Sequence, residues 1–241
     1  MKKTTRNTVV WVTGARTGIG RAIAMAFAER GAKVAVSSRQ AAGLKALVDR
    51  AKKKGWRVMD VACDVTDPES VGVACEAIRA SLGEVDVLVN NAGATVFKSF
   101  LDTGVGEMDT VLAANLRGPF LCTQAVLPGM VRRGGGMIVM INSVAAKKVF
   151  KNSSVYSATK AGLKAMADCI REEYRDRNIA VTSVFPGATL TPIWPETVRR
   201  NYRNRMMKPE DVASAVISAW LTPDRAMVEE IQLRPMGGDL D

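Results

Sequence analysis

The chain has 241 residues, of which 47% are hydrophobic and 24% are charged, and its formal net charge is +10. This length and composition are typical of a soluble globular domain and exclude a disordered or fibrous chain. The chain contains no histidine, which excludes Ser-His-Asp and Cys-His catalysis and the usual zinc chemistry, so a proton donor has to be Tyr, Lys, Asp, Glu or Cys.

The amino-terminal segment shows no targeting or membrane signal. Residues Met1–Arg6 are basic, and the apolar run Val9–Val12 that follows is too short for the core of a signal peptide. No stretch approaches the roughly 20 apolar residues that a membrane span needs. The four cysteines have no CxxC spacing, so we expect a reduced, cytoplasmic protein without a metal site or a membrane partner.

The positive charge has two interpretations, a solvated basic surface or a nucleic-acid partner. The basic residues are mostly dispersed, and only 5% of the chain is aromatic, whereas single-stranded nucleic acids are bound by aromatic residues among basic ones. We therefore favour the solvated surface and expect no nucleic-acid partner. The densest basic cluster is Arg199, Arg200, Arg203, Arg205 and Lys208.

Short apolar segments alternate with longer segments of helical periodicity along the chain. The strand candidates, several of them β-branched and without polar alternation, are Val9–Thr13, Lys33–Ser37, Arg57–Ala62, Val85–Asn90, Gly136–Ile141, Ala180–Phe185 and Glu230–Arg234. The helix candidates are Arg21–Arg30, Ala42–Lys54, Pro68–Leu82, Val105–Arg132, Val155–Arg177 and Pro209–Leu221.

This alternation predicts an α/β fold, a single doubly wound, Rossmann-type parallel sheet of about seven strands with helices on both faces. No linker or repeat interrupts the pattern, so residues 1–241 are expected to form one dinucleotide-binding domain. The long segment from residue 186 to 208 follows a strand end and is expected to be an irregular substrate lid.

A glycine-rich turn follows the first strand, with the sequence Thr13-Gly14-Ala15-Arg16-Thr17-Gly18-Ile19-Gly20. Glycines allow a sharp turn and a close approach of the backbone to a pyrophosphate, and the helix that follows offers free N–H groups to that anion. The spacing differs from G-x-G-x-x-G, but the strand–turn–helix context predicts a dinucleotide site. Its expected contacts are Gly14, Arg16, Thr17, Gly18, Ile19 and Gly20.

The end of the second strand indicates which dinucleotide binds. NAD-binding folds place an acidic residue there for the ribose 2′-hydroxyl, whereas this chain has Ser38 and Arg39. A serine and an arginine would bind a 2′-phosphate, and Arg16 would add a second positive charge. The sequence therefore favours NADP(H).

Tyr156 and Lys160 lie four residues apart in a helix candidate, so their side chains share a face. Tyrosine is a poor base near neutral pH because its reference pKa is about 10. We expect the Lys160 ammonium and a cationic nicotinamide to lower that pKa.

Together these motifs resemble the short-chain dehydrogenase/reductase family over almost the whole chain. The landmarks occur in the family's order and spacing: the Gly14–Gly20 turn, Asp64-Val65, Asn90-Asn91-Ala92-Gly93, Asn115, Ser143, Tyr156 with Lys160, and Pro186-Gly187. The resemblance implies hydride transfer between a nicotinamide and a carbonyl or secondary alcohol, with catalytic residues Asn115, Ser143, Tyr156 and Lys160.

The resemblance also implies roles for single residues. Tyr156 would be the general acid or base, Ser143 would hydrogen-bond the substrate oxygen, and Lys160 would bind the nicotinamide ribose. Asn115 would extend a proton relay through its backbone carbonyl, at a break in the long central helix. The remaining cofactor contacts would be Asp64 and Val65 at the adenine, Asn91, Ala92 and Gly93 at the adenosine ribose, and Pro186, Gly187, Thr189 and Thr191 at the nicotinamide.

The substrate stays open at this point. A 3-oxoacyl-thioester reductase is the first form to test, because the Arg199–Lys208 cluster would suit an acidic carrier protein or a coenzyme A phosphate. A solvated loop explains the cluster as well, so reduction of another ketone or aldehyde, or a polyol dehydrogenase, stands beside it. A dinucleotide sensor without activity would be expected to lack Tyr156 or Lys160. The family resemblance further implies a homo-oligomer, a dimer or a homotetramer, formed through Val105–Arg132 and Val155–Arg177.

Overall fold

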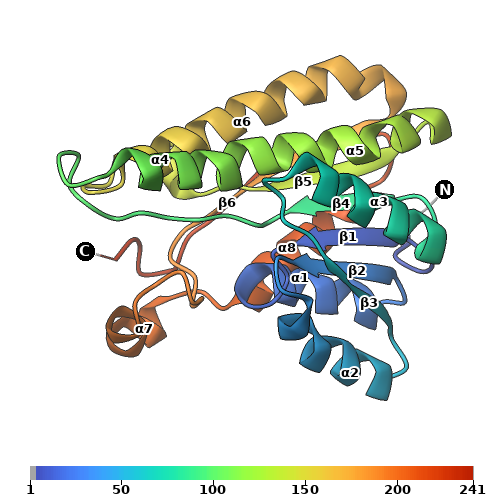
Figure 1. The fold of residues 1–241 in the computed structure, drawn as a ribbon, viewed down its shortest axis with the longest axis horizontal. Helices are drawn as coiled ribbons and strands as arrows, with labels where there is room; N and C mark the ends of the chain where they lie inside the picture. Colours follow the sequence, from blue (N-terminus) through green and yellow to red (C-terminus); the bar gives the residue numbers. More distant parts are fainter. Residues whose placement is uncertain (1–3, 241) are drawn as a thin grey trace.

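The computed structural model describes residues 4–240 and contains one parallel seven-stranded sheet with helices on both faces (Figure 1). The expected α/β fold is therefore confirmed. The strand order is β3-β2-β1-β4-β5-β6-β7. The strands are β1 (Val9–Thr13), β2 (Lys33–Ser38), β3 (Arg57–Ala62), β4 (Val87–Asn90), β5 (Gly136–Ile141), β6 (Ile179–Pro186) and β7 (Glu230–Leu233).

The central strands are apolar along their whole length because both of their faces are covered. Every residue of β1 and β4 is buried. Alternate side chains enter two separate cores: Val10 and Val12 pack in one, and Trp11 packs in the other. The indole Nε1 of Trp11 donates to the Ser37 hydroxyl at 2.9 Å, which satisfies the one polar atom that this large side chain buries.

Two layers of helices cover these cores (Figure 1). One layer holds α1 (Gly18–Glu29), α2 (Lys45–Lys53) and α8 (Pro209–Trp220), and the other holds α3 (Pro68–Leu82), α5 (Gly118–Arg133) and α6 (Ser154–Tyr174). The shorter helices are α4 (Val105–Leu112), before α5, and α7 (Glu196–Tyr202), which lies apart from the sheet near the C-terminal end of the chain.

Helix starts follow local chemistry that the sequence displays. Helices α3 and α8 begin at Pro68 and Pro209, as expected for proline at a first helical position. The Asp67 carboxylate caps α3 by accepting from the backbone N–H groups of Glu69 and Ser70, which have no partner inside the helix.

Three helix predictions differ from the structure. The predicted helix Val105–Arg132 is divided by a π-helical turn at Ala113–Arg117, which lies at the break that the family resemblance implied around Asn115. Hydrophobic periodicity alone does not register the one inserted residue. The first helix begins at Gly18 rather than Arg21, since glycine at a helix start carries no helical signal. The 186–208 segment is not wholly irregular, because it contains α7.

The order of the strands places the functional cleft. Strand β1 pairs with β2 on one side and with β4 on the other. The connection after β1 therefore runs towards one edge of the sheet, and the connection after β4 runs towards the other edge. This divergence opens a crevice at the carboxyl ends of β1 and β4. The glycine turn, the loop after β4 and the lid after β6 all start from this edge of the sheet.

Candidate active site

A cleft of about 1660 Å³ opens at the carboxyl edge of the sheet, which exceeds the 300–1,000 Å³ of a typical small-ligand pocket. All the residues that the sequence predicted for the site line this cleft, apart from Gly20. In chain order they are Gly14, Arg16, Thr17, Gly18, Ile19, Ser38, Arg39, Asp64, Val65, Asn91, Ala92, Gly93, Asn115, Ser143, Tyr156, Lys160, Pro186, Gly187, Thr189 and Thr191.

The glycine turn needs glycine for two separate reasons. Gly14 has a φ of +64°, and a Cβ on it would lie 2.7 Å from the Cα of Ala92. Gly20 lies inside α1, where a Cβ would come within 2.3 Å of the Asn91 amide nitrogen. Gly20 therefore lets the helix pack against the strand loop, while Gly14 shapes the wall of the cleft.

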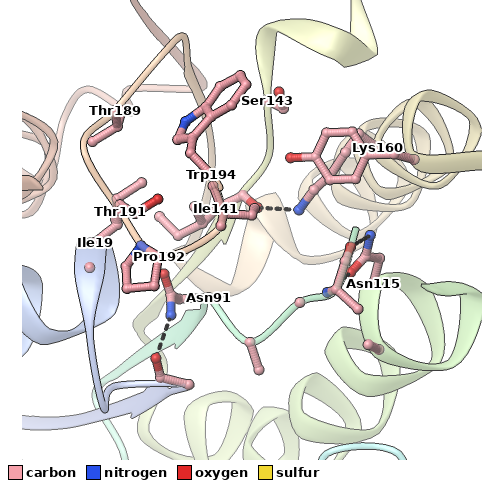
Figure 2. Close-up of a pocket in the computed structure, with 18 of the residues that line it drawn as sticks. Ile19, Asn91, Asn115, Ile141, Ser143, Lys160, Thr189, Thr191, Pro192 and Trp194 are labelled. Atoms are coloured by element: carbon pink, nitrogen blue, oxygen red, sulfur yellow. Dashed lines mark hydrogen bonds between the residues drawn. The ribbon is translucent and has the colours of Figure 1, made fainter. Parts of the chain in front are cut away.

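Asn91 holds the turn in place from the neighbouring strand. Its side-chain amide donates to the carbonyl oxygens of Thr13 at 2.9 Å and Gly14 at 3.0 Å, and Figure 2 shows one hydrogen bond from this amide. The Thr13 hydroxyl accepts from the backbone N–H groups of Asn91 and Ala92 in return, both at 3.1 Å. The sequence prediction gave Asn91 a cofactor contact only and missed this structural role.

Two arginines reach the cleft where β2 ends. The Arg16 side chain packs against Gly43, where a Cβ would lie 2.5 Å from the arginine Cδ. Arg39 lines the same part of the cleft. The Ser38 hydroxyl already donates to the Gln40 carbonyl at 2.7 Å, so as placed it offers an anion no proton and the positive charge comes from the arginines.

The Asp64 carboxylate lies at the end of β3 and is held locally. Hydrogen bonds from the Thr66 backbone N–H and hydroxyl, with the positive charge of Arg39, hold the pKa of Asp64 below its usual range against the effect of burial. The Thr66 bonds reach Oδ1 at 3.0 and 2.8 Å. Asp64 therefore stays ionised and keeps one end of the cleft rigid.

Tyr156 and Lys160 come from the first turns of α6 and share a face, as their spacing predicts. The Lys160 ammonium donates to the Ile141 carbonyl at the end of β5, at 2.8 Å (Figure 2). Lys160 is only 6% exposed, and this burial lowers its pKa to about 8. A buried lysine with a lowered pKa is unusual outside a functional site, because burying its positive charge costs free energy of folding.

The lowered Tyr156 pKa stays a prediction, because it combines the Lys160 ammonium with a cationic nicotinamide. In the chain alone, burial raises the pKa of Tyr156, and the Ser143 side chain opposes that rise only in part. The Lys160 ammonium lies 5.7 Å from the centroid of the tyrosine ring and donates to the Ile141 carbonyl. Without the cofactor the phenol therefore keeps its proton at neutral pH.

Ser143 follows β5 and contacts two groups. Its hydroxyl accepts from the Ala145 backbone N–H at 3.1 Å, which starts a short turn, and it lies close enough to Tyr156 to oppose the rise of the phenol pKa. The contact of Ser143 with a substrate oxygen stays a prediction.

Asn115 lies in the middle of the π-helical turn and is 1% exposed. Its amide pairs twice with Ala94, accepting from the backbone N–H at 2.8 Å and donating to the carbonyl at 3.0 Å, and it also donates to the Thr159 hydroxyl at 3.0 Å. Thr159 in turn donates to the Tyr156 carbonyl. The turn thus connects the loop after β4 to the helix that carries the tyrosine, and π-helical turns often mark functional sites.

The lid after β6 closes over the glycine turn. A Cβ on Gly18, whose φ is +60°, would lie 3.0 Å from the Thr191 side chain, and Ile19, Thr191 and Pro192 lie together in Figure 2. The Thr189 hydroxyl donates to the Gly187 carbonyl at 3.0 Å and is buried. The lid is therefore an ordered wall of the cleft.

The sequence predictions missed many residues of the cleft lining, among them Phe97, Trp194, Asp239 and Leu240. Phe97 follows the Asn90–Gly93 motif by a few residues, and Trp194 follows Pro186-Gly187. An aromatic residue soon after such a motif could have indicated a contact with the substrate. Asp239 and Leu240 carry no such signal, because only the folded chain shows that the C-terminal tail returns to the cleft.

No group of three or more potential metal ligands occurs in the described part of the chain. Among residues 4–240, no helix is both long and apolar enough to cross a membrane.

Comparisons with known proteins agree with this geometry. A family model described as short chain dehydrogenase matches residues 8–201. Sepiapterin reductase from Chlorobaculum tepidum is 38% identical, covering 96% of this chain and 98% of that protein.

Solved structures are similar over almost the whole chain as well. A 7 alpha-hydroxysteroid dehydrogenase complexed with NADH and 7-oxo glycochenodeoxycholic acid is 27% identical with a TM-score of 0.90, covering 99% of this chain and 96% of the other. A metagenomic short-chain oxidoreductase in complex with NADP is 29% identical with a TM-score of 0.85, covering 97% and 99%. With the family model matching most of its length, this chain belongs to the short-chain dehydrogenase family and is an oxidoreductase.

Proposed function

We propose that this chain is an NADP(H)-dependent carbonyl reductase in which Tyr156 donates the proton. One observation carries the proposal: a half-buried tyrosine beside Ser143, one helical turn from a buried lysine, lines the cleft into which the glycine turn opens. No other arrangement in the described residues combines a perturbed acid with a dinucleotide cradle.

The residues fit a dinucleotide. Gly14 lines the cleft and lets the turn pack directly on the backbone of Ala92, and the start of α1 directs free backbone N–H groups to the same end of the cleft. Arg16 and Arg39 support a 2′-phosphate at the far end. Of the two similar solved structures, one is a complex with NADH and the other with NADP, so the arginines are the argument for NADP(H) here.

The bound cofactor would supply the hydride, and the residues of the chain would supply the proton and the orientation. The Ser143 hydroxyl would hydrogen-bond the substrate oxygen beside Tyr156 and keep it where negative charge develops. Tyr156 Oη would transfer its proton to that oxygen. Lys160, fixed by the Ile141 carbonyl, and Asn115, fixed by Ala94, would position α6 and the adjoining loop during the transfer.

The substrate is proposed to be a small carbonyl compound. The similarity to a protein named sepiapterin reductase supports a carbonyl substrate. Reduction of a 3-oxoacyl thioester stays a prediction. Two members of its proposed basic docking cluster already bind the protein itself, because Arg199 Nε donates to the Trp194 carbonyl and Arg205 donates to the Asp239 carbonyl.

The homo-oligomer, a dimer or a tetramer, also stays a proposal. Ala158, Ala161 and Ala165 are exposed along α6, and Phe120 on α5 is 49% exposed. Small side chains beside a large apolar one would allow two copies to pack these helices closely.

Tyr156→Phe tests the proposal because it keeps the ring and removes the proton. General acid catalysis contributes about a hundredfold to ten-thousandfold, so kcat for NADPH oxidation with a carbonyl substrate should fall by that factor while NADPH still binds. Tyr174→Phe makes the same chemical change at the other end of α6, outside the cleft lining, and should leave kcat unchanged. Near-normal turnover in Tyr156→Phe would refute the assignment.

A further inference from the structure

Aromatic side chains gather at the substrate end of the cleft. The chain has few of them, six phenylalanines, three tyrosines and four tryptophans. Nevertheless, five line this one cleft: Phe97, Phe150, Tyr156, Trp194 and Tyr202. A solvent-facing lid has no need of such a concentration, since most aromatic residues of a small domain are used in its core.

Three of these rings form a continuous stack beside the proton donor. Phe97 meets the Tyr156 ring edge-on, with centroids 5.8 Å apart and planes at 62°. The other neighbour of Phe97 is Trp194, whose ring is nearly parallel to it at 11°, with centroids 6.0 Å apart. Phe97 is still 45% exposed, so the stack has ring surface that the protein itself does not cover.

The loops that carry Trp194 and Phe97 are held in place by hydrogen bonds and an ion pair. The Trp194 carbonyl accepts from Arg199 Nε, and its backbone N–H donates to the Thr191 carbonyl, both at 3.2 Å. The loop that carries Phe97 is fixed before it by the Ala94–Asn115 pair of hydrogen bonds and after it by the ion pair of Lys98 with Glu107. The rings are therefore preorganised.

The Asp239 carboxylate, which lines the cleft, is neutralised within the protein by ion pairs with Lys148 and Arg234. A negatively charged substrate would have to compete with this carboxylate for the two cations. Lys151, Asn152 and Ser153 add polar groups to the lining. Ring stacking is the interaction that the aromatic side chains offer beside them.

We propose that the substrate is a flat ring ketone that stacks on the Phe97–Trp194 pair, which makes these two residues determinants of specificity. The inference deepens the proposed function and rests on it for the reaction itself. A flat ring placed on the pair lies next to Tyr156, so a carbonyl on that ring comes within reach of the proton donor. An open-chain acyl group gains only the burial of its surface there, without the stacking contribution.

The test compares two ketones with equal numbers of carbons, isatin, which is flat and bicyclic, and methyl hexyl ketone, which is open-chain. The variants are Phe97→Leu and Trp194→Leu. The matched control is Phe100→Leu, in the same loop as Phe97 but 78% exposed and outside the cleft lining. The ratio of kcat/KM for the two ketones is followed across the variants, so the greater intrinsic reactivity of isatin cancels.

Each cleft variant should lower kcat/KM for isatin about tenfold, mainly through KM, and change it for methyl hexyl ketone by less than about twofold. Phe100→Leu should leave the ratio unchanged. An unchanged ratio in both cleft variants, or an equal fall in Phe100→Leu, would overturn the inference.

Isothermal titration of isatin into the enzyme with NADP⁺ separates this inference from the proposed function. If neither ketone is reduced, the proposed function fails, and binding still decides about stacking. Isatin affinity that falls about tenfold in the two cleft variants but not in Phe100→Leu supports the stack. Equal affinity in all four proteins overturns it.

Discussion

Burial of Lys160 makes the stability of the protein rise with pH in the alkaline range, where the carboxylates are already ionised. The pKa of Lys160 falls from 10.5 to about 8 because the ammonium is desolvated. The unfolded chain therefore holds this proton up to about pH 10.5, whereas the native protein releases it from about pH 8. Between these values the unfolded state binds more protons, so the free energy of unfolding rises with pH.

The size of the effect follows from the shift. One pKa unit corresponds to about 1.4 kcal/mol, so the buried charge costs about 3 kcal/mol at neutral pH and below. Between pH 7 and pH 10, about 2 to 3 kcal/mol of this cost should disappear. Lys160→Met removes the titrating group and keeps an unbranched side chain of similar length, so its stability should lack this rise.

Urea unfolding followed by tryptophan fluorescence, under reducing conditions, measures the difference. Both proteins should carry Tyr156→Phe, which removes the neighbouring phenol whose titration is coupled to the lysine. The change with pH decides the outcome, because methionine also leaves the Ile141 carbonyl without its donor and shifts the absolute stability. Parallel pH profiles for the two proteins would show that Lys160 titrates normally and would refute the reasoning.

Three further predictions concern packing and the cofactor. Gly93→Ala should lower kcat about tenfold, because a Cβ there would lie 2.9 Å from Asn115 Oδ1 and displace an amide held by hydrogen bonds; steady-state kinetics with unchanged kcat would contradict this. Arg171→Met should lower the free energy of unfolding by about 2 to 4 kcal/mol in urea titrations and leave kcat unchanged, because this buried guanidinium binds main-chain carbonyls of two segments outside the cleft. Ser38→Asp combined with Arg39→Ile should shift the ratio of kcat/KM from NADPH towards NADH by about ten- to a hundredfold; an unshifted ratio would count against the 2′-phosphate assignment.

The sequence predicted those features that depend on local chemistry. The central strands follow from apolar segments that are buried on both faces, whereas the edge strands β3 and β7 are partly exposed. The bounds of β1, β3 and β5 agree with the prediction. The spacing of Tyr156 and Lys160 predicted a shared face, because an α-helix repeats every 3.6 residues. The prediction of the glycine turn had the same local basis.

Other features arise only from contacts between distant segments. The π-helical turn around Asn115 is stabilised by Ala94 and Thr159, which lie far from it in the sequence, so helical periodicity does not reveal it. The stack of Phe97 on Trp194 joins the loop after β4 to the lid after β6. The position of Asp239 likewise depends on Lys148, 91 residues away in the sequence.

Burial has opposite effects on the two central groups, and together these effects favour reduction. Desolvation raises the pKa of the Tyr156 phenol and lowers that of the Lys160 ammonium to about 8, so each group is driven towards its neutral form. A neutral phenol is the state that can donate a proton to a developing alkoxide, whereas oxidation of an alcohol would need the phenolate. Because the chain alone stabilises the protonated tyrosine, we infer that the reducing direction uses the site as it is folded, and that oxidation requires added positive charge beside the ring. The rate of alcohol oxidation should accordingly still rise with pH above neutral pH, because more of the Tyr156 phenol loses its proton there. An oxidation rate that has already reached its plateau at neutral pH would contradict this inference.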